Sequence, residues 1–242
     1  MLEIQVDPSG YAAMFSGITN MLELVLDAAR EATAETGVGI GVIVAANRTR
    51  HPLDAKTLAR LARQYAGHGV CGFGLSNDER RGRARDFEGA FRIAKRGGLL
   101  SDPHGGELMG PESVRECLSM LGADRIGHGV RAAEDPALLD QVARAGVTLE
   151  VCPASNVSLG VAEEAGSVPV RRLVEGGAQI ALGADDPLLF GSRLLRQYEL
   201  CREVYGFSDS ESAEIARMSV RGSAAPDDVR KTMLAGIDEW VG

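Results

Sequence analysis

The stretch GLLSDPHGGELMGPESVRECLSMLGADRIGHG, residues 98–129, contains one complete strand–helix–strand repeat. An apolar run ends on His104, an amphipathic segment spans residues 111–122, and a second apolar run ends on His128. The amphipathic segment starts with proline and ends on glycine, which is the asymmetry expected of a helix. The repeat therefore predicts two parallel strands joined by a crossover helix.

The same alternation extends over the whole chain. Further apolar runs predict strands that begin at Leu2, Val38, Val70, Val147 and Ala178. Amphipathic segments between the runs predict helices, among them residues 54–67, where Asp54 is the expected N-cap. The chain beyond Pro187 is predicted to be helical, with Asp209 as an expected cap.

Seven strands of this kind fit either an open doubly wound sheet or a (β/α)8 barrel. Polar residues mark the predicted carboxyl ends of the strands: Asn47, Asn77, His104, His128, Ser155, Asn156, Asp185 and Asp186. In a barrel these ends converge on one mouth, whereas an open sheet spreads them along a line. No G-x-G-x-x-G opens a helix after the first strand, which disfavours a dinucleotide-binding sheet. We therefore predict an α/β fold, a (β/α)8 TIM-type barrel in a single domain over residues 1–242, with one strand fewer than eight.

Composition and charge exclude several classes of protein. The 242 residues are 45% hydrophobic and 25% charged, as in a soluble globular protein, and the net charge is -8. That charge argues against a nucleic acid or an anionic membrane surface as partner. No apolar run approaches a membrane span, and no leader pattern is present. The four cysteines never form C-x-x-C, so reduced thiols and a cytoplasmic location are expected.

The polar residues at the strand ends each have a functional and a structural interpretation. In HGGE, His104 is a candidate metal ligand and Glu107 a candidate acid or base, but a hydrogen-bonded interior histidine and a helix-start carboxylate explain them equally well. His128 is a candidate general base or a buried core histidine. Ser155 and Asn156 are best explained by turn hydrogen bonds.

Asp185 and Asp186 are adjacent carboxylates at a strand end, and they repel each other unless a cation or a ligand proton lies between them. One would bind metal and the other would hold substrate; alternatively, Asp186 caps the helix after Pro187. Taken together, histidine, glutamate, histidine and an aspartate pair at successive strand ends suit metal-assisted hydrolysis, in which a carboxylate shuttles protons and a histidine steadies the nucleophile.

Four motifs resemble a known family. HGGE, RIGHG, CPASN and GADDP are similar to the motifs HAGE, IGHG, CPxSN and TDDP, which follow one another in the adenosine deaminase family, and the similarity covers essentially the whole chain. The resemblance implies a (β/α)8 barrel with one zinc ion per chain. It also implies hydrolysis of the 6-amino group of adenosine or 2'-deoxyadenosine to give inosine and ammonia.

The resemblance further implies a role for each matching residue. The zinc ligands would be His104 and Asp185, Glu107 would protonate purine N1, and His128 would be the base that orients zinc hydroxide. In substrate binding, Asp186 would be the acceptor facing purine N7, and Asn77, in GLSNDE, would lie beside the purine. Two alternatives are a deaminase of another 6-aminopurine nucleoside, such as aminodeoxyfutalosine, and a non-catalytic nucleoside-binding remnant of the enzyme.

The chain also departs from the family pattern. It contains no H-x-H motif, which in the family lies on the first strand and supplies two zinc ligands, so the first strand and the helices after it are expected to be missing. Gly105 replaces the usual alanine, and Asn77 replaces a glycine. Two ligands would hold zinc weakly. The strands at residues 2–6 and 179–182 should have unpaired edges, which favour self-association or a complementing N-terminal segment.

Overall fold

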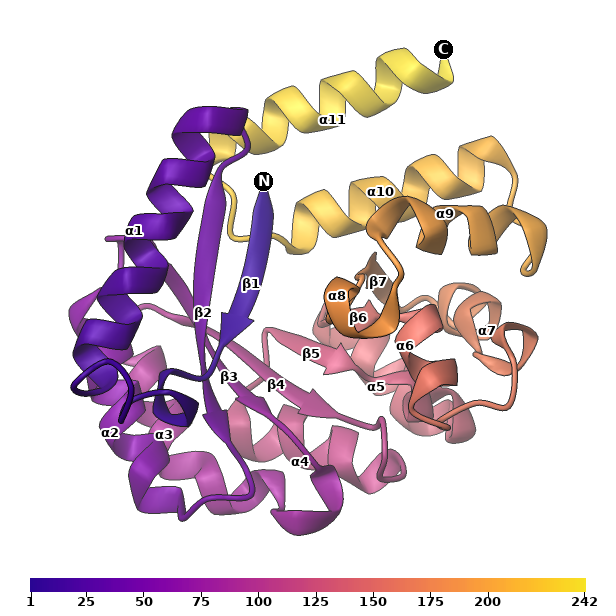
Figure 1. The fold of residues 1–242 in the computed structure, drawn as a ribbon. Coiled ribbons are helices and arrows are strands. Elements are labelled where there is room, and N and C mark those ends of the chain that lie inside the picture. Colours follow the sequence, from indigo (N-terminus) through magenta and orange to yellow (C-terminus); the bar gives the residue numbers. More distant parts are fainter. The chain divides into compact units, whose positions relative to one another are not determined.

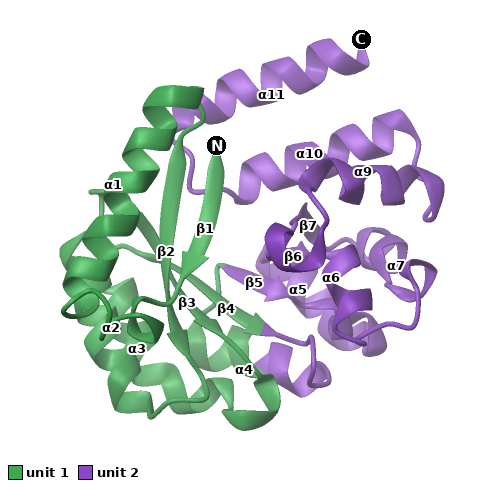
Figure 2. Ribbon diagram, viewed as in Figure 1, with its two compact units in different colours: residues 1–104, 116–124 green, residues 105–115, 125–242 purple.

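The computed structural model describes residues 1–242 (Figure 1), and the chain divides into two compact units (Figure 2). Unit 1 contains residues 1–104 and 116–124, and unit 2 contains residues 105–115 and 125–242. The division falls within strand β4 and helix α4, so that each unit has its own strands and its own covering helices.

Unit 1 is a four-stranded parallel sheet with helices packed on it (Figure 1). Its strands are β1 (Leu2–Val6), β2 (Ile40–Asn47), β3 (Val70–Ser76) and β4 (Leu100–Gly105). Its helices are α1 (Ile18–Thr36), α2 (Pro52–Gln64), α3 (Glu88–Lys95) and the second half of α4 (Pro111–Leu121), with short 3-10 turns η1 (Pro8–Gly10), η2 (Glu79–Arg81) and η3 (Ala84–Phe87). Strand β2 is buried from its second residue to its seventh, which is why it reads as one apolar run.

The interior of the unit 1 sheet holds a polar contact that depends on a glycine. The Gln5 side chain crosses from β1 to donate to the Asp102 carboxylate on β4, at 3.0 Å. It passes over Gly74, where an added Cβ would lie 2.7 Å from Gln5 Oε1. The absence of a side chain at Gly74 therefore lets β1 and β4 interact through a partly buried hydrogen bond.

Unit 2 is a three-stranded parallel sheet covered by the remaining helices. Its strands are β5 (Arg125–His128), β6 (Thr148–Val151) and β7 (Gln179–Leu182). Its helices, besides the first half of α4, are α5 (Pro136–Ala145), α6 (Pro153–Ser158), α7 (Val170–Glu175), α8 (Pro187–Phe190), α9 (Leu194–Glu203), α10 (Asp209–Gly222) and α11 (Asp227–Val241), with 3-10 turns η4 (Val130–Glu134) and η5 (Ala165–Ser167). The register aligns Ile126, Leu149 and Ile180, and all three are fully buried. Helix α10 packs against β7 and joins this core.

The order of the strands supports the barrel class. In each unit the strands lie in chain order, and each pairs with its neighbour in sequence. A doubly wound sheet permutes this order, whereas a (β/α)8 barrel preserves it. The predicted fold class, an incomplete (β/α)8-type arrangement with seven parallel strands, is therefore confirmed, while the single domain stays a prediction. Strands β1 and β7 each pair on one side only, as expected.

Local predictions were wrong at two helix starts. Helix α2 is capped by His51, whose Nδ1 accepts from the Leu53 amide at 3.2 Å, and Asp54 lies inside the first turn. His51 is the N-cap because Pro52 fits the first helical position, which makes the preceding residue the cap. Helix α10 is capped by Ser208, and Asp209 is its first residue.

The segment DERRGRARD, residues 78–86, is rich in charged residues, which predicts a solvated loop, but Glu79 within it is only 3% exposed. All four cysteines are free thiols, as predicted. No helix combines the length and the apolar character that crossing a membrane requires.

Candidate active site

The HGGE segment is held in place by the backbone that follows β5. The Gly129 amide donates to Gly105 O at 2.9 Å, and the Arg131 amide donates to Gly106 O at 3.0 Å. Gly106 has a φ of 68°, and an added Cβ would lie 2.3 Å from Val114 Cγ2. A glycine is required there for both reasons, and the resulting turn sets the position of Glu107.

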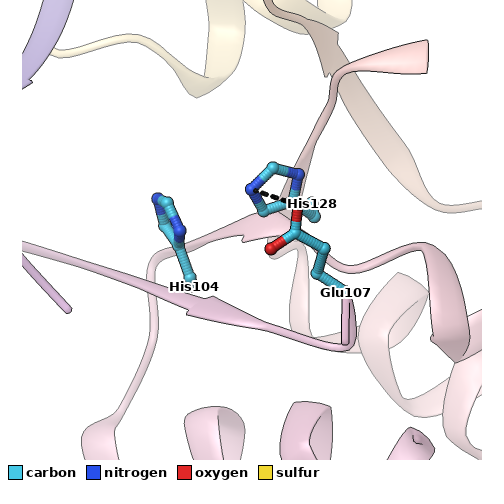
Figure 3. A group of neighbouring side chains, drawn as sticks. All are labelled: His104, Glu107 and His128. Carbon is cyan, nitrogen blue, oxygen red and sulfur yellow. Dashed lines mark ion pairs between the residues drawn. The ribbon is translucent and has the colours of Figure 1, made fainter. Parts of the chain in front are cut away.

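Glu107 and His128 form a buried pair. Glu107 Oε1 lies 3.4 Å from His128 Nε2, and the two residues are 5% and 3% exposed (Figure 3). The pair brings together a strand-end histidine and a carboxyl group that enters from the glycine turn. Such a pair can hold and exchange one proton out of contact with bulk water.

His104 neighbours this pair and is placed by its own strand. It is the fifth residue of β4 and is bonded directly to Gly105. Buried Arg48 donates to the His104 carbonyl and, at 3.0 Å, to Gly82 O, so the end of the strand is fixed within unit 1. The potential ligand atoms of His104, Glu107 and His128 lie within 4.8 Å of one another (Figure 3).

A second group forms where the strands of unit 2 end. Gly127 aligns with Glu150 and Val151 aligns with Leu182, so the residues that follow lie at the same edge of the sheet. As a result His128, Cys152 and Asp185 offer an imidazole nitrogen, a thiol sulfur and a carboxylate oxygen within 4.8 Å of one another.

The two groups fit a transition-metal ion by the chemistry of their donors. Zinc in proteins is bound by imidazole nitrogen, thiolate sulfur and carboxylate oxygen, and the strand ends supply all three types of donor. A hard cation such as Mg²⁺ would instead require mainly oxygen ligands.

Backbone strain coincides with the candidate residues. Four non-glycine residues have a positive φ, and three of them are Asn77, His128 and Asp185, at 81°, 66° and 55°. Side chains rarely adopt this region, and such strain gathers at functional sites. The left-handed backbone at Asn77 also explains how this position accepts either glycine or asparagine.

Comparison with known proteins supplies the family. A sequence profile described as adenosine deaminase matches residues 1–240, almost the whole chain. This chain belongs to the adenosine deaminase family.

Individual relatives agree with this assignment. A Streptomyces coelicolor protein with the provisional name adenosine/adenine deaminase is 65% identical over 240 residues, which are 99% of this chain and 70% of that protein. An adenine deaminase of Rhizobium leguminosarum bv. trifolii is 36% identical over 233 residues, 96% of this chain and 72% of that protein.

Solved structures agree on the fold. The crystal structure of an adenine deaminase from Arthrobacter aurescens has a TM-score of 0.92 and 29% identity, covering 99% of this chain and 73% of that one. A zinc-bound amidohydrolase from Burkholderia ambifaria has a TM-score of 0.85 at 22% identity, over 98% of this chain and 66% of that chain. The chain thus has the fold of a family whose members are hydrolases.

The remaining deaminase motifs take up different positions. In CPASN, Ser155 Oγ donates to Cys152 O at 3.1 Å, the turn hydrogen bond expected from the sequence. Asn156 is fully buried, and its Nδ2 lies 3.5 Å from Nδ1 of His128, so this motif also orients the imidazole. Asn77 lies on unit 1 and is exposed, and its Oδ1 accepts from the Asp78 amide at 3.4 Å.

Two side chains in and near the GADDP motif have pKa values raised above their ordinary values. Partial burial and the neighbouring Asp185 charge raise the pKa of Asp186 above its ordinary value. Burial, followed by the charges of Asp185, Glu150 and Glu107, raises the pKa of the Cys152 thiol well above its ordinary value. Asp186 precedes α8 without capping it through its side chain, so helix capping does not explain this residue.

Cys152 is the residue that sequence reasoning missed. It directly precedes Pro153 at the end of β6, and its position between a buried strand and a helix that starts with proline was the available signal. The spacing of the four cysteines alone predicts only reduced thiols and no metal-binding pattern.

Proposed function

We propose that the chain catalyses zinc-dependent hydrolytic deamination of a 6-aminopurine, with adenine as the preferred substrate and adenosine as the alternative. The observation that carries the proposal is the buried pair of Glu107 and His128, 3.4 Å apart at the strand ends. Adenine is placed first because the Rhizobium relative and the Arthrobacter structure both carry that name. Adenosine, the substrate expected from the motifs, remains supported by the family profile.

His104 and Asp185 are the residues we assign to the zinc ion, by their match to the family motifs HAGE and TDDP. When bound, zinc lowers the pKa of a water molecule toward about 7 and so makes a nucleophile available at neutral pH. The chain's own residues then govern the movement of protons around that water and the purine.

Two residues carry the proton transfers. His128 orients the attacking water and accepts its proton, while the Glu107 carboxyl donates a proton to purine N1. Addition of the water oxygen at C6 and loss of the 6-amino group convert the substrate and one water into the 6-oxopurine and ammonia. Because His128 Nε2 faces Glu107 Oε1, the proton accepted by one group can return to the other, which restores both for the next turnover.

Asp186 and Asn77 are assigned to substrate binding. Partial burial and the Asp185 charge raise the pKa of Asp186, and its carboxylate would accept a hydrogen bond from the N7–H tautomer of the purine. Asn77 has an exposed amide on a left-handed turn, which suits a contact with the purine edge.

The test is a deamination assay with the purified chain and added zinc. Adenine and adenosine are supplied separately, and hypoxanthine, inosine and ammonia are measured by chromatography and a coupled ammonia assay. We expect a higher kcat/KM for adenine. A higher value for adenosine would overturn the preference for the free base, and the absence of both products would overturn the deaminase itself.

The role of Glu107 is tested by Glu107→Gln, which keeps the shape and removes the acid. We expect kcat to fall roughly 10²- to 10⁴-fold, the usual contribution of general acid–base catalysis, with a smaller change in KM. Glu112→Gln is the matched control, because Glu112 is an exposed glutamate on α4. Equal kcat values for Glu107→Gln and the unmodified chain would contradict the mechanism.

A further inference from the structure

Cys152 lies at the edge of the candidate active site, but the proposed reaction does not use it. The residue is 7% exposed, and its sulfur faces a histidine and an aspartate from the two neighbouring strand ends. The three donors come from the last residue of β5, the residue after β6 and the segment after β7, all within unit 2. Their proximity therefore follows from strand pairing inside one compact unit.

We propose that His128, Cys152 and Asp185 form a binding site for a soft divalent cation such as Cd²⁺. The donor atoms lie within 4.8 Å of one another, so small side-chain movements bring all three to one ion. Thiolate sulfur selects soft, thiophilic metals, and imidazole and carboxylate complete a three-ligand site that leaves a position open. This ligand set shares Asp185 with the zinc assignment and adds the one thiol at the strand ends.

A cation that binds to Cys152 takes the place of the proton on its sulfur. When the cation binds, the Sγ–H bond breaks, the Sγ–metal bond forms, and the proton leaves to the buffer. Each bound ion should therefore release one thiol proton.

Occupation of the site has a consequence for catalysis. His128 and Asp185 would both be withdrawn from the roles assigned to them above, so the cation would inhibit deamination. This consequence rests on the proposed function, whereas the binding itself does not. A binding measurement therefore tests the cation site separately from the proposed deaminase activity. Cation binding can be observed even if the chain has no deaminase activity.

The experiment is a titration of the purified full chain with CdCl2, monitored by the ultraviolet thiolate-to-cadmium charge-transfer absorption. We expect a band that saturates at one cadmium per chain and is lost in Cys152→Ser. Cys71→Ser is the matched control, because Cys71 is the only thiol of the four that is not buried, and it should keep the band. A band that survives Cys152→Ser, or no band in the unmodified chain, would overturn the site.

A second variant keeps the test decisive if Cys152→Ser fails to fold. Asp185 is exposed, and asparagine tolerates its left-handed backbone, so Asp185→Asn should fold normally, as far-ultraviolet circular dichroism would verify. Loss of this ligand should weaken cadmium binding by at least about tenfold while the sulfur band persists at saturation. An unchanged affinity in Asp185→Asn would contradict the three-ligand site.

Discussion

At the residue scale, the candidate site depends on backbone conformations that few residues tolerate. His128 and Asp185 adopt positive φ angles, and Gly106 adopts a positive φ in the turn that follows β4. Such conformations persist only when the surrounding hydrogen bonds and packing hold them. In this chain the amides of Gly129 and Arg131 do so for the glycine turn.

Gly106→Ala should therefore disturb both stability and the position of Glu107. The new Cβ would meet Val114 at 2.3 Å in a left-handed conformation, so we expect the free energy of unfolding to fall by about 1–3 kcal/mol. Chemical denaturation measures this change. Gly110→Ala, in the same loop but with no atom within 4 Å of the added Cβ, should stay within about 0.5 kcal/mol of the parent chain. Equal losses in the two variants would contradict a specific requirement at Gly106.

Asp186 should titrate in a way that depends on its neighbour. Because the Asp185 charge contributes to its raised pKa, Asp185→Asn should lower the pKa of Asp186 toward the ordinary value, leaving the part due to burial. Carboxyl carbon NMR of the metal-free protein measures the shift. Asp140→Asn, an exposed change on α5, should leave this pKa unaltered, and a response equal to that of Asp185→Asn would refute the local origin of the shift.

The same group links pH to stability. A carboxyl whose pKa is raised on folding binds its proton more tightly in the folded state, so the free energy of unfolding falls as pH rises from the ordinary value through the raised one. Asp186→Asn removes this effect. The variant should therefore gain stability relative to the parent chain as pH rises from the ordinary pKa through the raised one. A gain in relative stability as pH falls would contradict this prediction.

At the element scale, the sequence predicted which segments fold but not where each begins. All seven strands and the helices around residues 54–67 and 111–122 were predictable, because apolar periodicity depends on many side chains at once. The caps of α2 and α10 were missed because a cap depends on one side chain and on the residue next to it. His51 was passed over although Pro52 follows it, and Ser208 was passed over in favour of Asp209.

The cap of α10 is worth a test because this helix packs against β7. Ser208 Oγ accepts from the Glu211 amide, and the Glu211 carboxylate accepts from the Ser208 amide at 2.8 Å, which completes a capping box. Ser208→Ala should lower the free energy of unfolding by about 1 kcal/mol at neutral pH. Thr232→Ala, at an exposed position on α11, serves as the control and should change it by less than about 0.5 kcal/mol.

The capping box also has a defined response to acid. Hydrogen bonds from Ser208, backbone first, lower the pKa of Glu211, so its contribution is present above the ordinary carboxyl value and is lost as pH falls through the lowered one. The difference between Ser208→Ala and the parent chain should shrink in that range. A difference that is independent of pH would show that the carboxylate takes no part in the cap.

At the scale of the whole molecule, the barrel class was predictable because polar residues mark the carboxyl ends of the strands, which a barrel gathers at one mouth. The pairing of the strands in chain order agrees with this prediction. The division into two compact units was not predictable, since it depends on contacts between distant segments that no periodicity encodes. For the same reason the position of Cys152 beside His128 and Asp185 was not predictable. These two residues are 24 and 33 residues away in the chain, and strand register alone brings them close to Cys152.

Binding of a metal at the strand ends should stabilise the whole fold, because its ligands come from segments that are adjacent only in the native state. An ion that binds the folded state alone adds about 2.7 kcal/mol to the free energy of unfolding when its concentration is 100 times Kd. We therefore expect Tm to rise with zinc concentration in thermal denaturation, and the rise to be smaller in Asp185→Asn. Mg²⁺ is the matched control and should leave Tm unchanged, because the site offers nitrogen and sulfur besides oxygen. A Tm that is unaffected by zinc, or one that magnesium raises equally, would show that these strand ends do not form the metal site on which the proposed reaction depends.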